Sequence, residues 1–126
     1  MFLEHVNLTV TDLDASVAFY RELLDLRVRW EGHAIGEKGK VRACHVGNDR
    51  VYLALFETEA PDRATSHYGR AGLNHFGFVV DDLDETRRRV TALGAQLHFE
   101  AEYEPGRRIY LFDPDGIEIE LVQYAA

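Results

Sequence analysis

The sequence predicts an α+β fold built from two similar modules, each with a strand, a helix and about three further strands. A short pattern recurs at an offset of 70 residues, so that Leu3 to Asp14 aligns with Leu73 to Asp84. Each copy is followed by apolar residues at helical spacing and then by extended segments. We therefore expect one domain of residues 1–126, with module one at about 1–57, a linker at about 58–70 and module two at about 71–126.

Each predicted helix has a start and a stop signal. Asp12 and Asp82 are placed to cap the two helices, while Asp25 and Gly94 mark their ends. The first helix carries Val17, Tyr20, Leu23 and Leu24 at helical spacing, with Phe19 beside them, and the second is expected to point Thr86, Val90 and Leu93 inward. Extended segments are predicted at 27–30, 41–46 and 51–57, and again at 96–100, 107–112 and 117–123.

Composition excludes several classes of partner. A net charge of -8 and a pI near 5.1 argue against nucleic acid, which needs concentrated Lys and Arg. The basic run Arg87 to Arg89 follows acidic residues in one predicted helix, which indicates a solvated face with local charge pairing. A single cysteine, Cys44, fits a reducing compartment, and no apolar run is long enough to span a membrane. We expect a cytoplasmic protein without a membrane partner.

Strand alternation places a histidine on the same face of each module. In the first strand, His5 shares a face with Asn7 and Thr9, opposite the apolar residues that should pack under the helix. In the second copy, His75 shares a face with Gly77, whose missing side chain leaves space. Both histidines are therefore predicted on the more polar side of their sheets.

The turn Asp113-Pro114-Asp115-Gly116 predicts the register of the last two strands. If the loop is Pro114-Asp115-Gly116, with Gly116 left-handed before a bulge, Tyr110 lies opposite Glu120 on the face that carries His75. Aligning the two terminal hairpins places Ala54 where the second module has Glu120. The first module therefore offers no second carboxylate.

These segments resemble the vicinal oxygen chelate superfamily, which includes glyoxalase I, bleomycin-resistance proteins, extradiol dioxygenases and fosfomycin-resistance enzymes. The resemblance is carried by residues 3–10, 16–24, 73–80 and 112–120. It implies two βαβββ modules that form a half-open mixed-sheet barrel, completed in a homodimer. His5 would then share one site with His75 and Glu120 of the partner subunit.

The resemblance implies one divalent metal per site, Fe, Mn, Ni or Zn, held by His5, His75 and Glu120. Such a donor set leaves positions open, so a small substrate can chelate the metal through neighbouring oxygens. Tyr110 and Glu120 are the predicted catalytic residues, Tyr110 as a hydrogen-bond donor or proton carrier. Ala54 departs from the glyoxalase I pattern. Residues Tyr110 to Glu120 match the extradiol dioxygenase pattern, but this chain lacks the histidine that the pattern places around 101–103.

Three functions follow from this interpretation. The first is a metal-dependent enzyme, with lyase or isomerase chemistry, thiol transfer and dioxygenation as open branches. The second is a metal-free protein that binds a drug or metabolite, as bleomycin-binding relatives do. The third is a degenerate module retained as an interaction subunit, which the alanine at position 54 keeps open. Retention of all three ligands favours the enzyme.

Overall fold

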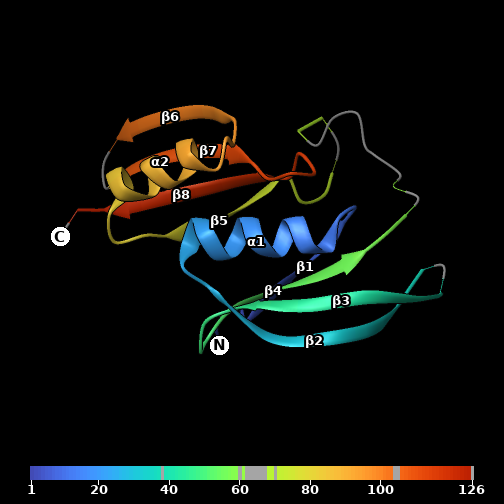
Figure 1. Ribbon diagram of the computed structural model, residues 1–126. Helices are drawn as coiled ribbons and strands as arrows, with labels where there is room; N and C mark the ends of the chain where they lie inside the picture. Colours follow the sequence, from blue (N-terminus) through green and yellow to red (C-terminus); the bar gives the residue numbers. More distant parts are fainter. Residues whose placement is uncertain (38, 60, 62–67, 70, 104–105, 126) are drawn as a thin grey trace. The chain divides into compact units, whose positions relative to one another are not determined.

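The computed structural model describes residues 1–37, 39–59, 61, 68–69, 71–103 and 106–125 (Figure 1). The chain divides into two compact units, Met1–Asp62 and Arg63–Ala126, which are described separately. The predicted linker at 58–70 falls largely outside the described residues. Within the described part of the chain, no helix is long and apolar enough to cross a membrane.

The unit Met1–Asp62 is a four-stranded sheet with one helix. Its elements are β1 (His5–Val10), α1 (Leu13–Leu24), β2 (Arg27–Gly36), β3 (Gly39–Gly47) and β4 (Tyr52–Glu57). The strand order is β1-β4-β3-β2, and β1 runs parallel to β4 while the other pairs are antiparallel. Figure 1 shows α1 lying along this sheet.

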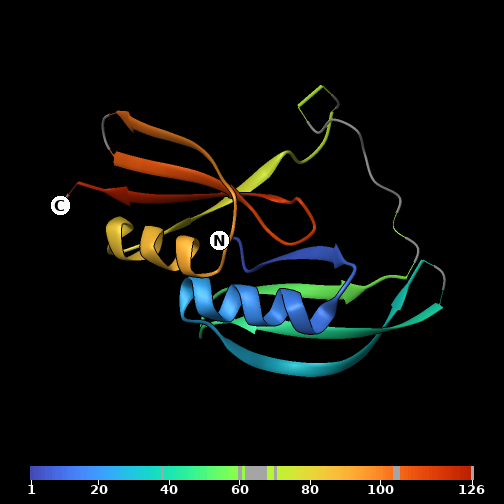
Figure 2. The same cartoon turned by 45° about the horizontal axis from the view of Figure 1, so that its top comes forward.

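The unit Arg63–Ala126 repeats the arrangement (Figure 2). Its elements are β5 (His75–Val79), α2 (Leu83–Ala92), β6 (Leu97–Tyr103), β7 (Gly106–Phe112) and β8 (Glu118–Tyr124), and its strand order is β5-β8-β7-β6. The predicted sequence of strand, helix and three strands is thus confirmed in both halves. The β2–β3 hairpin is longer than predicted because antiparallel pairing continues as far as Gly36 and Gly39, beyond the apolar residues that marked the strands.

The helices begin and end where the sequence predicts. The Asp12 and Asp82 caps have the same backbone angles, φ -137° and ψ 99°, and each carboxylate accepts a 3.0 Å hydrogen bond from the amide three residues later. Asp25 (φ 53°) and Gly94 (φ 67°) take the left-handed conformation at the helix ends. These local signals are strong because capping chemistry depends on only a few adjacent residues.

The buried stripe of α1 differs from the prediction. Tyr20 and Leu23 are fully buried, but Val17 and Leu24 are only half-buried, and Ser16 is buried in their place. In α2, Thr86 and Val90 are buried while Leu93 is half-buried. The strands supply most of the core, through Leu8, Val10, Val46, Leu53, Leu55, Ile109, Leu111, Ile119 and Leu121. The helix faces were less predictable because burial depends on which strands each helix crosses.

Cys44 on β3 lies on the buried face, with 2% of its surface exposed. Burial raises the pKa of its thiol, and the thiolate is the reactive form. We therefore expect the native protein to react with Ellman's reagent at neutral pH at least about tenfold more slowly than the denatured chain. Equal rates in the native and denatured protein would show that Cys44 is not enclosed.

Candidate metal centre

His75 lies between two glutamates on the face of the second sheet. The parallel pairing of β5 with β8 sets His75 opposite Glu118 and Gly77 opposite Glu120. As a result, His75 Nε2 lies 3.4 Å from Glu120 Oε1, and His75 Nδ1 lies 3.5 Å from Glu118 Oε1. The two ring nitrogens therefore face different carboxylates.

The β7–β8 turn places Glu120, and it has the predicted bulged form. Asp113 N–H donates to the Ile117 carbonyl at 2.9 Å, and the Gly116 N–H donates to the Asp113 carbonyl at 3.0 Å. Gly116 has φ 78°, which is left-handed, and the Asp113 carboxylate accepts from Asp115 and Ile117 amides. Tyr110 pairs with Glu120 across the hairpin, so the predicted register is confirmed.

The two oxygens of Glu120 have different neighbours. Arg108 Nε lies 3.4 Å from Oε2, and the Arg108 side chain is 9% exposed, whereas Oε1 faces the His75 ring. A β-carbon added at Gly77 would lie 3.4 Å from the Glu120 β-carbon. Glycine at position 77 therefore leaves the Glu120 side chain room beside β5, and Arg108 leaves Oε1 as the oxygen directed toward His75.

Tyr110 lies beside the same histidine. Its ring meets His75 edge to face, with 5.5 Å between the ring centroids, and it contacts Phe99 at 5.9 Å. Because Tyr110 pairs with Glu120 across the ladder, its phenol is carried on the strand next to the carboxylate. The three predicted residues of this unit, His75, Tyr110 and Glu120, are thus brought together.

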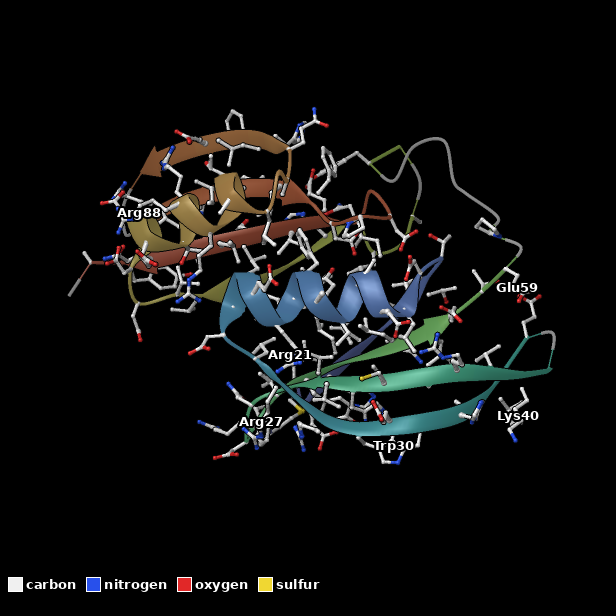
Figure 3. The ribbon with its side chains drawn as sticks, in the orientation of Figure 1. Arg21, Arg27, Trp30, Lys40, Glu59 and Arg88 are labelled. Carbon is white, nitrogen blue, oxygen red and sulfur yellow. The ribbon has the colours of Figure 1, made fainter. Side chains whose placement is uncertain are left out.

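His5 lies in the other unit and begins a row of rings that crosses its sheet. The row runs from His5 on β1 through Tyr52 on β4 and His45 on β3 to Trp30 on β2. Successive ring centroids lie 4.8, 4.6 and 4.8 Å apart. The Arg29 guanidinium lies 4.6 Å from the centre of the Tyr52 ring. Trp30 is 43% exposed and lies on the outer side of β2 (Figure 3).

The two histidines of this row have different surroundings. Burial lowers the pKa of His45, and the nearby His5 and Arg29 lower it further. His5 itself is half-exposed, and its Nδ1 lies 2.9 Å from Glu4 Oε1. The His5 ring is therefore held by Tyr52 on one side and by Glu4 at Nδ1.

Ala54 takes the place of Glu120 in the first unit. The β1–β4 register pairs His5 with Tyr52 and Asn7 with Ala54, in the same steps that pair His75 with Glu118 and Gly77 with Glu120. The alignment made from the sequence is therefore confirmed. Ala54 is 5% exposed, so the carboxylate of the second unit is replaced by a small buried side chain.

Two of the three predicted ligands meet within one unit. His75 Nε2 and Glu120 Oε1 converge, and an imidazole with a carboxylate is a donor pair that suits divalent transition metals. Across the described ranges, no group of three or more His, Cys, Asp or Glu side chains is placed to hold a metal. The second unit thus supplies two side chains of the kind that metal sites use.

The sequence did not single out Glu118 as a site residue. Glu118 lies on β8, an interior strand of its sheet, and its side chain is 1% exposed. Tyr68 O–H donates to it, which raises the pKa of Tyr68 to about 12, and His98 Nε2 lies 3.6 Å away. Alternation with Glu120 and the pairing with His75 were the available signals. Tyr68, in the connector, gave none.

Arg108 was also missed as a neighbour of Glu120. It shares a strand face with Tyr110 because the two lie two residues apart on β7.

The basic run in α2 behaves as predicted. Arg88 pairs with Glu85 at 2.7 Å and Arg87 pairs with Glu100, both near the surface. Arg88 lies on the outer side of α2 (Figure 3).

The sequence and the fold of this chain are similar to those of known proteins. A family model described as the Glyoxalase/Bleomycin resistance protein/Dioxygenase superfamily matches residues 2–121. A solved structure described as a glyoxylase/bleomycin resistance protein/dioxygenase domain from Frankia sp. EAN1pec superposes with a TM-score of 0.82 and 27% identity. That superposition covers 99% of this chain and 93% of the Frankia chain.

Two further proteins are similar in sequence. The glutathione transferase FosA of Serratia marcescens is 30% identical over 123 residues, which cover 94% of this chain and 78% of FosA. An Arabidopsis thaliana protein described as "Probable lactoylglutathione lyase, chloroplastic" is 28% identical over 128 residues, which cover 94% of this chain. The aligned region spans 35% of the Arabidopsis protein, so this chain corresponds to about a third of it.

Proposed function

The chain belongs to the Glyoxalase/Bleomycin resistance protein/Dioxygenase superfamily, and on that premise we propose that it is a divalent-metal-dependent enzyme. Its substrate is a small molecule that binds the metal through two neighbouring oxygens. The convergence of His75 Nε2 and Glu120 Oε1 beside Tyr110 carries the proposal. The ligands are His5, His75 and Glu120, and one ion of Fe, Mn, Ni or Zn occupies each site.

The proposed site is shared between two copies of the chain. His5 of one subunit joins His75 and Glu120 of the partner subunit, so a twofold homodimer holds two equivalent sites. Two observations support this arrangement. His5 belongs to a different compact unit from the other two donors, and neither unit gathers three donors among its own described residues. The two units act together as one domain of residues 1–126.

Each residue of this chain has a distinct task in the proposed mechanism. A bound divalent ion supplies Lewis-acid stabilisation of negative charge on the substrate. Arg108 holds Glu120 Oε2, which leaves Oε1 directed at the site. Tyr110 donates a hydrogen bond from its phenol to the substrate or carries a proton to it. The ring row from His5 to Trp30 provides a partly apolar wall for the organic part of the substrate.

Among the open branches, we favour addition of a thiol such as glutathione to the substrate. The similarity to FosA, a glutathione transferase, supports this branch. The replacement of a second carboxylate by Ala54 argues against the lactoylglutathione lyase reaction. Isomerase or lyase chemistry and dioxygenation are the other branches that an activity screen should include.

Metal titration tests the proposed function. The protein should bind about one equivalent of Mn²⁺ per chain, and His75→Ala should weaken binding by at least about a hundredfold because one neutral donor is lost. His33→Ala is the matched control, since His33 is an exposed histidine on β2 and should leave affinity unchanged. Less than a tenth of an equivalent with Mn²⁺, Fe²⁺, Ni²⁺ and Zn²⁺ alike would count against the enzyme.

The ring row favours one alternative function, the metal-free binding of a planar aromatic molecule. The stacked His5, Tyr52 and His45 rings, with Trp30 tilted against His45, give an aromatic surface against which such a molecule can pack. A planar dye bound equally tightly by the wild type and by His75→Ala, with no dependence on metal, would favour this alternative. The enzyme proposal predicts instead that ligand affinity falls when metal is removed.

A further inference from the structure

The structure contains a buried carboxylate that the proposed ligand set does not use. Glu118 is 2% exposed as a whole residue and lies on an interior strand of its sheet. Removing a carboxylate from water is costly unless hydrogen bonds or charges compensate. The compensating groups around Glu118 are the Tyr68 hydroxyl, the His75 ring and the His98 ring. This energetically costly position pairs across the sheet with His75, a proposed metal ligand.

The two nitrogens of His75 have separate surroundings. Nε2 faces Glu120, whereas Nδ1 faces oxygen atoms: Asn74 Oδ1 at 2.7 Å, the Tyr68 hydroxyl at 3.3 Å and Glu118 Oε1 at 3.5 Å. An amide oxygen and a carboxylate accept hydrogen bonds, so they favour a proton on Nδ1. A neutral ring with its proton on Nδ1 keeps the Nε2 lone pair free to bind a metal.

Glu118 is poorly placed to bind the same ion itself. It contacts the Nδ1 side of the ring, and Glu120 contacts the Nε2 side. An ion held between Nε2 and Glu120 Oε1 would have the imidazole ring between it and Glu118. The first unit supports the same distinction, because the position equivalent to Glu118 is Tyr52, which stacks on His5.

We propose that Glu118 is a positioning residue that fixes the orientation and tautomer of His75 for metal binding. This inference rests on the proposed function. Asn74 supplies the shorter hydrogen bond, and Glu118 adds a negative charge that favours the proton on Nδ1 and increases the donor strength of Nε2. Tyr68 keeps Glu118 in place by donating to Oε1. In the first unit, Glu4 Oε1 lies 2.9 Å from His5 Nδ1, and Tyr52 stacks on the His5 ring.

Two substitutions separate the charge of Glu118 from its hydrogen bonding. Glu118→Gln removes the charge and keeps the size, and we expect Mn²⁺ to bind about tenfold more weakly. Glu118→Leu also removes the acceptor, and we expect a loss of about a hundredfold. Glu100→Gln is the matched control because Glu100 is an exposed carboxylate paired with Arg87 in the same unit. The Mn²⁺ affinity of this variant should equal that of the wild type. Thermal unfolding identifies any variant that fails to fold.

A second readout does not depend on metal. Long-range ¹H–¹⁵N spectra of the metal-free protein report which nitrogen of His75 carries the proton. We expect the Nδ1–H form in the wild type and a mixture of tautomers in Glu118→Gln. Unchanged tautomers together with unchanged Mn²⁺ affinity in folded Glu118→Gln would overturn the positioning role.

The two readouts also distinguish failure of this inference from failure of the proposed function. If the wild type binds no metal but Glu118→Gln alters the His75 tautomer, the metal-enzyme proposal is wrong and the positioning of His75 by Glu118 stands. If the wild type binds Mn²⁺ and Glu118→Gln changes neither readout, the positioning role is wrong and the enzyme proposal stands.

Discussion

Replacing Glu120 with glutamine is expected to weaken Mn²⁺ binding by about a hundredfold or more, with little change in thermal stability. Glu120 is the only anionic member of the proposed ligand set, so its loss removes the main charge attraction for the ion. Glutamine keeps the length of the side chain, and its amide oxygen can still accept a hydrogen bond from Arg108. Isothermal titration with Mn²⁺ and a thermal melt of the metal-free protein measure the two effects separately.

The control for Glu120→Gln is the same substitution at an exposed carboxylate outside the proposed ligand set. Glu100→Gln removes the same charge from β6 in the same unit, where Glu100 pairs with Arg87 near the surface. Its Mn²⁺ affinity should equal that of the wild type. If Glu120→Gln bound Mn²⁺ as tightly as Glu100→Gln, Glu120 would not be a ligand, and the register of the β7–β8 hairpin would have no functional consequence.

Replacing Ala54 with glutamate is expected to destabilise the metal-free protein and to strengthen metal binding. Ala54 is 5% exposed, and an unpaired carboxylate at this buried position should cost about 2 to 4 kcal/mol of unfolding free energy. The new carboxylate would stand in the same register to His5 as Glu120 does to His75, so it can serve as a fourth ligand. We expect Mn²⁺ affinity to rise by about tenfold or more.

The free energy of unfolding, measured with and without Mn²⁺, tests the Ala54→Glu prediction most directly. Metal that binds only the folded protein stabilises it by about 2.7 kcal/mol at a hundred times its dissociation constant. Saturating Mn²⁺ should therefore recover most of the stability lost in Ala54→Glu. Ala54→Gln is the control, because it adds the same volume without an anionic donor, and Mn²⁺ should stabilise it no more than the wild type. Equal metal rescue of both variants would contradict a fourth ligand position at residue 54.

Much of this fold could be predicted because its signals are local. An aspartate before each helix, a left-handed residue after it and a Pro-Asp-Gly loop each act over a few residues, and the structure confirms all three. The loop also set the register of a whole hairpin, because shifting a strand by one residue moves every side chain to the opposite face. The prediction that Tyr110 and Glu120 pair could therefore be made from four turn residues.

The surroundings of His75 could be predicted only in part. Alternation placed His75 and Glu120 on one face, but it could not show that Glu118 is buried or that Tyr68 reaches it from a distant segment. Those contacts depend on tertiary packing rather than on spacing along a strand. The repeat placed His5 and His75 at equivalent positions of their modules, but the assignment of both to one site came from a family resemblance.

Co-purified mixed dimers test the shared three-ligand site most directly. His5→Ala and His75→Ala chains, carrying different tags and produced together, can be isolated as the heterodimer by two affinity steps and analysed for Mn²⁺ after titration. A shared site predicts that each single-variant homodimer binds almost no Mn²⁺, while the heterodimer binds half the wild-type amount because one of its two sites is intact. A heterodimer as empty as the homodimers, or single variants that retain wild-type Mn²⁺, would contradict the assignment of His5, His75 and Glu120 to one site between subunits.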